Sequence, residues 1–420
     1  MKPEQSDAFV LFGATGDLAH KKIFPALRNL IHAGRLDMPV IGVARNEGDV
    51  QLDTPVQYVT GDYRTHETFI KLREALGDAR HPLFYLAIPP AMFASVAEGL
   101  GKTGCSQGAR IIVEKPFGRS LASAQELNEQ LLEVFDESQI FRIDHYLGKE
   151  SVQNLLVFRF ANSFLEPAWN AHHIESVRIT MSEKFGVEGR GAFYEEAGAI
   201  RDVVQNHLLE VVTYLAMEPP ISTGSEDVSR RQLDVLRSIR PLDPSNVVRG
   251  QARGYRAEKN VAPESTVETF AALRMQIDSP RWRGAPFIIR AGKFLNETKT
   301  EVLVTLKEAP LPRLADGSQN CLRFRLTPDV AITIEARIKK GGERLTSEPA
   351  ELSLVDSTPG DDLDAYTRLL GDAIIGERML FAHEEFVEAA WAIVDPILGD
   401  AAPLYFYEPG TTGPQEADRL

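Results

Sequence analysis

The first 150 or so residues alternate short apolar runs with helix-like patterns, and this alternation constrains the fold more than any other feature. Continuous apolar runs without polar alternation are typical of parallel strands that are covered on both faces. These runs lie at residues 8–12, 40–44, 83–88 and 111–113. The intervening or following helical patterns lie at residues 67–76, 91–100 and 123–135. The sequence therefore predicts an α/β domain with a Rossmann-like, doubly wound parallel sheet.

After about residue 150 the pattern changes to longer, partly alternating strands that follow one another along the chain. These strands are predicted at residues 176–181, 269–277, 287–290, 301–306, 322–326 and 331–338. Strands that arrive in runs favour an antiparallel sheet, and helical patterns at residues 200–217 and 384–393 would cover one face of it. We predict a dinucleotide-binding domain over residues 1–149. A larger α+β domain over residues 150–420, with a mostly antiparallel sheet, would bind substrate and mediate oligomerisation.

Composition excludes several classes of function. The two cysteines cannot form a disulfide framework or a four-ligand zinc site, which predicts a cytoplasmic protein without a metal centre. The net charge of −14 argues against nucleic acid or an acidic membrane as a partner. No apolar run approaches the roughly 20 residues that cross a bilayer. An acidic chain can still bind a phosphate where it gathers cations locally.

The first predicted strand runs directly into the glycine turn Gly13-Ala14-Thr15-Gly16-Asp17-Leu18. Glycines at a strand-to-helix turn let backbone amides approach a pyrophosphate, and the helix N-terminus adds partial positive charge. The spacing of the two glycines is shorter than in the usual dinucleotide fingerprint, so a plain structural turn is an alternative on these residues alone. The position of the turn in an alternating α/β segment favours a dinucleotide.

Arg45 ends the second predicted strand, at the position that distinguishes the two nicotinamide coenzymes. An acidic residue there binds the ribose hydroxyls of NAD, whereas an arginine accommodates the 2′-phosphate of NADP. Glu47 and Asp49 follow closely and would weaken a phosphate site. The sequence favours NADP and leaves NAD open, with an exposed arginine of no special role as the alternative.

Two segments, residues 142–150 and 198–209, concentrate side chains suited to catalysis. An isolated histidine is more often a structural imidazole, and an isolated lysine is more often solvated. Both segments nevertheless occur in one chain beside a nucleotide-binding pattern. This combination indicates an active site rather than coincidence.

The chain resembles the glucose-6-phosphate dehydrogenase family over nearly its whole length. The motifs that carry this resemblance lie at residues 13–19, 84–90, 114–119, 142–149, 202–207, 290–293 and 413–418. The resemblance implies oxidation of the C1 hydroxyl of glucose 6-phosphate to 6-phosphogluconolactone, with hydride transfer to NADP, in the pentose phosphate pathway. Because the family forms dimers or tetramers, it also implies a homodimer or homotetramer.

The resemblance further implies roles for individual residues. His207 would be the general base, since a neutral histidine can accept a hydroxyl proton near pH 7, and Asp144 would orient it. The coenzyme would contact Gly13, Thr15, Gly16, Asp17, Leu18, Arg45, Pro89 and Lys115. The substrate would contact Lys22, Lys115, His145, Tyr146, Lys149, Glu183, Asp202 and Lys293, with the phosphate on His145, Tyr146 and Lys149. Pro116 would follow a cis peptide bond.

Two positions depart from the family pattern. Thr298, followed by Lys299, stands where members usually have Lys or Arg, and Thr327 stands where many have Gln. Because one lost charge-assisted hydrogen bond costs roughly 1.5–3 kcal/mol, either Lys299 reaches the substrate or the preferred sugar differs.

Two rival hypotheses concern the activity as a whole. In the first, the same fold acts with NAD, or on another phosphorylated or free sugar. In the second, the chain is a catalytically silent nucleotide-binding relative. Such a relative is expected to have lost the general base or its partner, and the presence of both Asp144 and His207 argues against this hypothesis.

Overall fold

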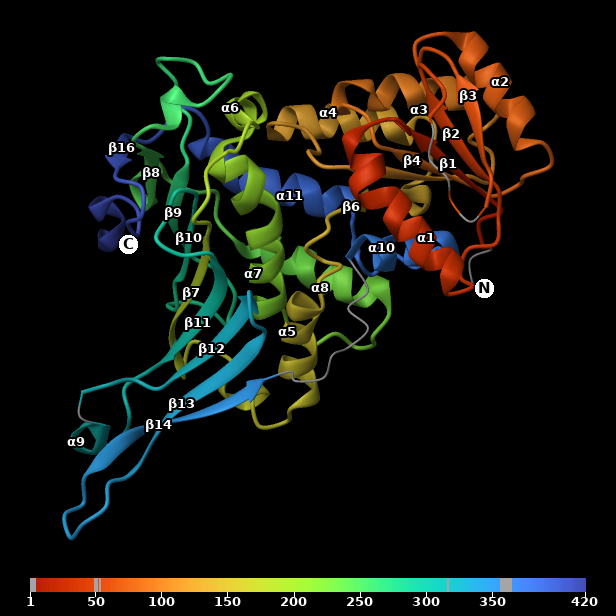
Figure 1. Cartoon of the computed structure of the whole chain (residues 1–420). Helices are drawn as coiled ribbons and strands as arrows, with labels where there is room; N and C mark the ends of the chain where they lie inside the picture. The colour runs from red at the N-terminus through yellow and green to blue at the C-terminus, as the bar shows by residue number, and fades with distance from the viewer. Residues whose placement is uncertain (1–4, 49–51, 53, 316, 356–364) are drawn as a thin grey trace. The chain divides into compact units, whose positions relative to one another are not determined.

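The structure, a computed structural model, describes residues 5–48, 52, 54–315, 317–355 and 365–420 (Figure 1). The chain divides into two compact units. The first comprises Met1–Lys149, Pro220–Arg230 and Asp361–Glu388, and the second comprises Glu150–Pro219, Arg231–Gly360 and Ala389–Leu420. Among the described residues, none of the helices combines the length and the apolar character that a membrane crossing requires.

A seven-stranded sheet organises the first unit, in the order β15-β6-β5-β4-β1-β2-β3. Its strands are β1 (Ala8–Phe12), β2 (Val40–Ala44), β3 (Val56–Thr60), β4 (Pro82–Leu86), β5 (Arg110–Glu114), β6 (Ile140–Ile143) and β15 (Phe381–Ala382). All neighbours are parallel except β15 with β6. The order 3-2-1-4-5-6 of the parallel strands is that of a Rossmann sheet, which confirms the predicted α/β class.

Helices of the first unit pack in two groups, which explains why its strands carry continuous apolar runs. The helices are the π-helix η1 (Ala19–Ile23), α1 (Phe24–His32), α2 (His66–Leu76), α3 (Phe93–Lys102), α4 (Leu121–Leu132) and α10 (Ala365–Ile375). Helix α3 packs with α2 and α4, whereas α1 packs with α10 and η1. Strands β1, β2 and β4 are buried at every residue, as expected for a sheet covered on both faces.

A nine-stranded sheet organises the second unit, in the order β14-β13-β12-β11-β7-β10-β9-β8-β16. Its strands are β7 (Ile174–Ser182), β8 (Val247–Ala252), β9 (Phe270–Met275), β10 (Phe287–Gly292), β11 (Lys299–Leu306), β12 (Cys321–Thr327), β13 (Ala331–Lys339), β14 (Ser347–Val355) and β16 (Leu404–Tyr407). Neighbours are antiparallel apart from β10 with β7 and β16 with β8. The predicted mostly antiparallel sheet is confirmed.

The helices of the second unit include a π-helix that is central to the site. They are α5 (Glu150–Ala161), α6 (Gly191–Ala199), the π-helix η5 (Ile200–Leu208), α7 (Leu209–Ala216) and α9 (Pro312–Ala315). Helices α8 (Ser225–Ser238) and α11 (Glu384–Val394) have residues in both units. Segment η5 continues directly into α7, so the stretch predicted as one helix is a π-helix followed by an α-helix.

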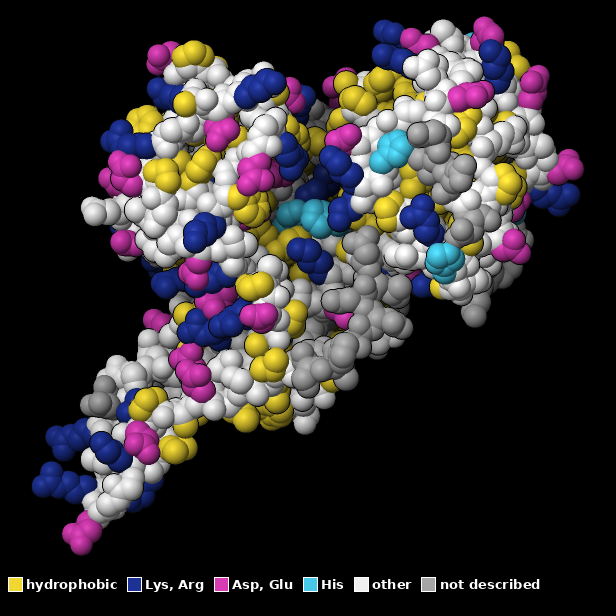
Figure 2. Space-filling view, viewed as in Figure 1, with side chains coloured by type: hydrophobic (Ala, Val, Ile, Leu, Met, Phe, Trp, Pro, Cys, Tyr) yellow, Lys and Arg dark blue, Asp and Glu magenta, His cyan; other side chains and the backbone are white. Residues whose placement is uncertain are grey.

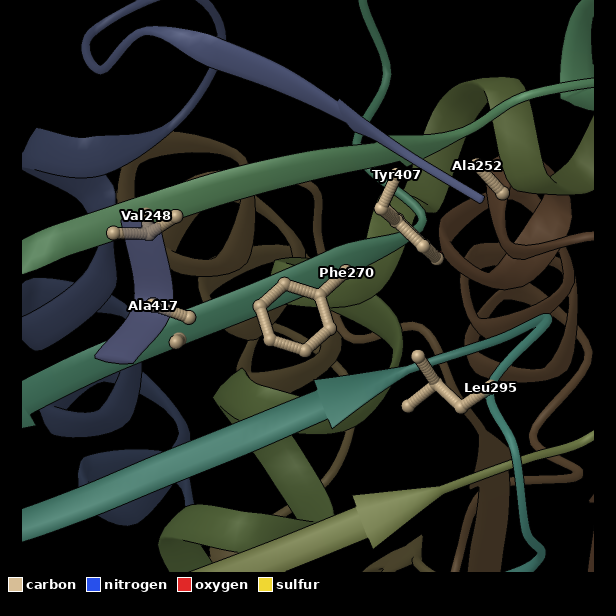
Figure 3. Packing of buried hydrophobic residues seen from close by; sticks show 7 residues of the cluster. Val248, Ala252, Phe270, Leu295, Tyr407 and Ala417 are labelled. Carbon is tan, nitrogen blue, oxygen red and sulfur yellow. The ribbon is translucent and has the colours of Figure 1, made fainter. Parts of the chain in front are cut away.

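A buried cluster in the second unit fixes the end of β10. Phe270 of β9 and Tyr407 of β16 belong to this cluster, with smaller side chains around them (Figure 3). A Cβ atom at Gly292 would lie 2.8 Å from the Phe270 ring, so the close packing requires glycine at this position. The Tyr407 hydroxyl donates to the carbonyl of Lys293 at 2.7 Å. The cluster therefore holds the backbone that carries Lys293.

Candidate active site

The glycine turn lies at the carboxyl end of β1, beside the end of β4. Gly13 has a φ of +79°, and a Cβ atom there would lie 2.2 Å from the carbonyl oxygen of Ala87. Only glycine satisfies both constraints. The Gly13 amide donates to the carbonyl of Val43 at 3.0 Å and to the hydroxyl of Tyr63 at 2.9 Å. Tyr63 was not a sequence candidate, because nothing in the pattern links it to the turn.

The residues that follow Gly13 leave room for a ligand. Thr15 and Asp17 are exposed, and Gly16 and Leu18 are half-buried. A Cβ atom at Gly16 would have only the carbonyl oxygen of Gly13, at 3.1 Å, within 4 Å. The Asp17 carboxylate pairs with Lys21 at 2.7 Å, which offsets the repulsion it would exert on a phosphate. The space and the helical amides of this turn fit the pyrophosphate of a dinucleotide.

Arg45 follows β2 and is exposed, so it is accessible to a 2′-phosphate, and its role as a ligand stays a prediction. The hydrogen-bonded pair with Arg64, at 2.7 Å, lowers the pKa of the nearby Asp62 to about 2. Asp62 also interacts with the charge of Arg45, but its hydrogen-bonded partner Arg64 offsets the repulsion that it would exert on a 2′-phosphate. Glu47 is exposed, and Asp49, which was expected to weaken the phosphate site, lies outside the described residues.

Other residues predicted to contact the coenzyme or, in the case of Lys22, the substrate also lie at or near the carboxyl ends of strands. Pro89 follows β4, is exposed and precedes a short 3-10 turn (Pro90–Met92). Lys115 follows β5, and its peptide bond to Pro116 is cis, as expected. Lys22 lies on η1, just after the glycine turn, and is exposed. In an open α/β sheet, ligands bind outside the carboxyl ends of the strands, and these residues lie there.

Asp144 comes next to Lys115 because β5 and β6 are parallel neighbours. The Lys115 ammonium lies 3.7 Å from Oδ2 of Asp144, whose side chain is 1% exposed. Oδ1 of Asp144 accepts the backbone N–H of Tyr146 at 2.8 Å. The two contacts fix the orientation of this carboxylate.

The three predicted phosphate ligands lie in one loop after β6. The Lys149 ammonium lies 4.1 Å from the centroid of the Tyr146 ring, a cation–π contact. The His145 imidazole packs edge-to-face on the same ring, with centroids 6.0 Å apart. An imidazole, a phenol and an ammonium are hydrogen-bond donors suited to a phosphate monoester. The loop thus gathers one cation and two neutral donors, a combination by which an acidic chain can bind a phosphate.

Glu183 and Lys293 meet in the second unit for a topological reason. Strands β7 and β10 run parallel with Ser182 opposite Gly292, so the residues that follow them are neighbours. Glu183 and Lys293 form a short hydrogen-bonded ion pair. The Lys293 ammonium also lies 4.9 Å from the ring centroid of Phe185.

Tyr194 connects this pair to Asp202. The Lys293 ammonium lies 5.7 Å from the Tyr194 ring centroid. Burial, together with the negative charges of nearby Asp202 and Glu183, raises the pKa of Tyr194. The structure therefore groups the predicted substrate residues Glu183, Asp202 and Lys293 around one tyrosine. Sequence reasoning missed this tyrosine, since aromatic residues at helical spacing usually pack in a core.

His207 lies in the π-helix η5 and is 4% exposed. Asp202 precedes it by five residues and is half-buried. Because a π-helix bonds residue i to residue i+5, this spacing places Asp202 and His207 on the same helical face. Asp144 belongs to the first unit and His207 to the second, so the expected Asp–His pair stays a prediction.

Thr298 and Lys299, where the sequence departs from the family pattern, are both engaged locally. The Thr298 hydroxyl accepts the backbone N–H of Lys184 at 2.9 Å. The Lys299 ammonium pairs with Glu297 at 2.9 Å and lies 3.8 Å from Glu301. These contacts do not favour the hypothesis that Lys299 supplies the missing charge to the substrate.

Comparison with known proteins gives consistent similarities. The profile described as the NAD binding domain of glucose-6-phosphate dehydrogenase matches residues 10–54 and 50–154, and the profile of its C-terminal domain matches residues 156–420.

Two curated relatives and one solved structure show the extent of the similarity. Glucose-6-phosphate 1-dehydrogenase 1 of Mycobacterium tuberculosis is 39% identical over 99% of this chain and 94% of its own length. The cytoplasmic isoform of Solanum tuberosum is 38% identical over 98% of this chain and 90% of its own length. A solved glucose-6-phosphate dehydrogenase in complex with its substrate glucose 6-phosphate has a TM-score of 0.91 and 34% identity, covering 100% of this chain and 97% of that one.

Proposed function

The chain belongs to the glucose-6-phosphate dehydrogenase family, and we propose that it oxidises the C1 hydroxyl of glucose 6-phosphate to 6-phosphogluconolactone with NADP as hydride acceptor. The observation that carries this proposal lies in the first unit. The His145–Lys149 loop, with its three phosphate donors, follows β6 of the sheet in which β1 ends at the Gly13 turn. A phosphate monoester and a dinucleotide thus have candidate sites off the carboxyl ends of one sheet.

We assign His207 the removal of the C1 hydroxyl proton. When bound, the coenzyme supplies the nicotinamide ring that accepts the hydride from C1. As the C1–H bond breaks, the C1 oxygen loses its proton to the imidazole and becomes the carbonyl oxygen of the lactone. Asp144 would orient the imidazole and stabilise the imidazolium that forms.

Substrate orientation is assigned to the side chains that the family resemblance indicates. The phosphate would lie on His145, Tyr146 and Lys149. The sugar hydroxyls would meet Glu183 and Asp202, with Lys293, Lys115 and Lys22 as further contacts. Because Lys293 already pairs with Glu183, a sugar that binds both must exchange this ion pair for its own hydrogen bonds.

NADP is the proposed coenzyme because of Arg45 and its surroundings. The arginine is exposed at the end of β2, and the neighbouring carboxylate of Asp62 is neutralised by Arg64. A guanidinium in that position suits a 2′-phosphate. The remaining contacts would come from Gly13, Thr15, Gly16, Asp17, Leu18, Pro89 and Lys115.

A homodimer or homotetramer is proposed, with the large sheet as the contact surface. Strand β14 is an edge strand of that sheet, and its Leu352 and Leu354 are 60% and 50% exposed. They share a face with Ile338 of β13, because the register pairs Leu352 with Ile334 and Leu354 with Ile332. In Figure 2 basic side chains gather around the tip of this hairpin. Light scattering should give a dimer or larger species, and Leu352→Lys should reduce its mass.

The domain limits and cellular location are also proposals. Residues 1–149 would form the dinucleotide-binding domain and residues 150–420 the domain for substrate and oligomerisation. A cytoplasmic location is proposed, in line with the description of the potato relative as a cytoplasmic isoform.

A different sugar phosphate is the second candidate substrate. Thr298 stands where family members usually have Lys or Arg, and its hydroxyl bonds to the backbone of Lys184. The neighbouring Lys299 pairs with Glu297 and so does not replace the missing cation. Discrimination for glucose 6-phosphate over related sugar phosphates would then be weaker.

The test is an assay of nicotinamide reduction that crosses NADP and NAD with a panel of sugars and sugar phosphates. The proposal expects the highest kcat/KM for glucose 6-phosphate with NADP. A higher kcat/KM for another sugar phosphate would support the second candidate. The absence of reduction with every combination would contradict both.

A further inference from the structure

The loop that carries the phosphate ligands rests on a distant part of the chain, the first turn of α10. A Cβ atom at Gly148 would lie 3.0 Å from Cδ1 of Leu369 and 3.1 Å from the carbonyl oxygen of Ala365. The Arg368 guanidinium donates to the carbonyl of Gly148 at 3.2 Å. The end of the loop is therefore docked against α10 by close packing and by a hydrogen bond.

Tyr366, in the same turn of α10, lies against His145, one of the three residues proposed to bind the phosphate. Its ring is nearly parallel to the His145 imidazole, with an interplanar angle of 9° and centroids 6.4 Å apart. Tyr146 meets the same imidazole edge-on, as described above. The two tyrosine rings contact the imidazole in different orientations, which restricts its rotation.

The hydroxyl of Tyr366 is anchored by Glu114. Glu114 accepts hydrogen bonds from Tyr366 and from Tyr85 of β4. It ends β5 and precedes Lys115, and both Lys115 and Asp144 interact with its charge. The Glu114 carboxylate therefore holds the hydroxyl of the ring that packs on His145.

We propose that Tyr366 is a positioning residue for the sugar phosphate: its ring holds the His145 imidazole in the orientation that binds the phosphate, and Glu114 holds the ring. This inference rests on the proposed function, because the ligand of His145 is taken to be the 6-phosphate. Because the observed contacts of Tyr366 are with His145 and Glu114, its removal should affect phosphate binding rather than hydride transfer. Without the Tyr366 ring, the His145 imidazole would be free to rotate. Ordering it when the phosphate binds costs conformational entropy, which weakens binding.

The experiment compares Tyr366→Leu, which removes ring and hydroxyl, with Tyr366→Phe, which keeps the ring. Tyr366→Leu should raise KM for glucose 6-phosphate about tenfold, while kcat and KM for NADP change less than twofold. Tyr366→Phe should raise KM for glucose 6-phosphate less than threefold. Phe164→Leu, at an exposed phenylalanine that follows α5, is the control for loss of an aromatic ring outside the site and should leave all three constants unchanged.

Free glucose, which lacks the phosphate, separates positioning from general damage. For Tyr366→Leu, kcat/KM with glucose should stay within twofold of the wild type. Equal losses with glucose and glucose 6-phosphate would overturn the inference, as would an unchanged KM for glucose 6-phosphate. If Tyr366→Leu does not fold, Gly148→Ala tests the same docking, because its added methyl displaces the loop from α10 and should produce the same phosphate-specific rise.

A binding measurement distinguishes failure of this inference from failure of the proposed function. If the wild type does not oxidise glucose 6-phosphate, equilibrium binding of glucose 6-phosphate measured by calorimetry replaces KM. About tenfold weaker binding to Tyr366→Leu than to the wild type and to Tyr366→Phe would then support the inference. Equal binding to all three, or no binding to the wild type, would overturn it.

Discussion

Oε1 of Glu268 accepts the backbone N–H of Ile200 at 3.1 Å, at the first residue of the π-helix that carries His207. The carbonyl oxygen of Glu268 accepts the preceding amide, that of Ala199, at 3.0 Å. Gly198 turns the chain there with a φ of +60°, and a Cβ atom would lie 2.5 Å from Oε1. A buried carboxylate at a helix N-terminus satisfies a free amide and complements the helix dipole. Glu268 therefore fixes where this helix begins.

Removing Glu268 should take away the buried carboxylate that pairs with Arg249 and leave the exposed Asp400, 3.3 Å away, as its counter-charge. The Arg249 guanidinium lies 3.4 Å from Glu268, and both side chains are nearly fully buried. Glu268→Ala should lower the free energy of unfolding by about 3 kcal/mol, the lower end of the cost of breaking a buried pair, because Asp400 still pairs with Arg249. The double variant Glu268→Ala/Arg249→Leu should recover much of this loss in a denaturant titration. A double variant as unstable as the single one would show that the pair is not the cause.

His207→Asn tests the assigned base. Asparagine cannot accept the hydroxyl proton, so kcat should fall at least about a hundredfold, while KM for glucose 6-phosphate changes little. His172→Asn, at an exposed histidine outside the site, is the matched control and should keep full turnover. Undiminished kcat in His207→Asn would remove His207 from the mechanism.

The fold was largely predictable because burial on both faces leaves a direct trace in sequence. Strands β1 and β2 lie where the continuous apolar runs of residues 8–12 and 40–44 placed them. Strand β3 was missed, since only Val59 of its five residues is buried and polar Gln57 and Thr60 interrupt its apolar residues. Strand β14 was missed for the same reason, because its described side chains are half-buried or exposed.

Helix ends and the surroundings of the site depend on contacts that sequence patterns do not carry. Helix α4 begins before residue 123 because Ser120 caps it, with Ser123 completing the reciprocal capping bonds. Motifs supplied the candidate site residues, but Tyr366 and Glu268 lie far along the chain from the residues they support. Only the packing of α10 and β9 brings them there.

Arg45→Ala tests the coenzyme preference. Loss of one charge-assisted contact to the 2′-phosphate should raise KM for NADP about ten- to a hundredfold and leave KM for NAD within twofold. Arg80→Ala is the control, since Arg80 is exposed and precedes β4, at the amino end of the strand. Similar losses for both coenzymes would mean that Arg45 does not touch the 2′-phosphate.

The pH dependence of stability should report on Glu114. Burial raises the pKa of Glu114 to about 7 from 4.5, so the folded state binds its proton more tightly than the unfolded state. Its contribution to stability is complete below pH 4.5 and is lost as pH rises through about 7. The free energy of unfolding of the wild type minus that of Glu114→Gln should therefore fall by about 3 kcal/mol over this interval.

His383 acts in the opposite direction but cancels in that difference. Burial lowers the pKa of His383 to about 4 from 6.5, so its contribution is present above pH 6.5 and is lost as pH falls through about 4. Both proteins contain His383, so denaturant titrations of the pair isolate Glu114. A difference that stays constant with pH would contradict the assignment.

The central claim, hydride transfer from C1 of glucose 6-phosphate to NADP, is tested most directly with substrate deuterated at C1. Mass spectrometry of the coenzyme after turnover should show one deuterium in each reduced nicotinamide that forms, and lactone as the other product. Reduced nicotinamide without deuterium, or no reduction at all by the folded protein, would contradict the account.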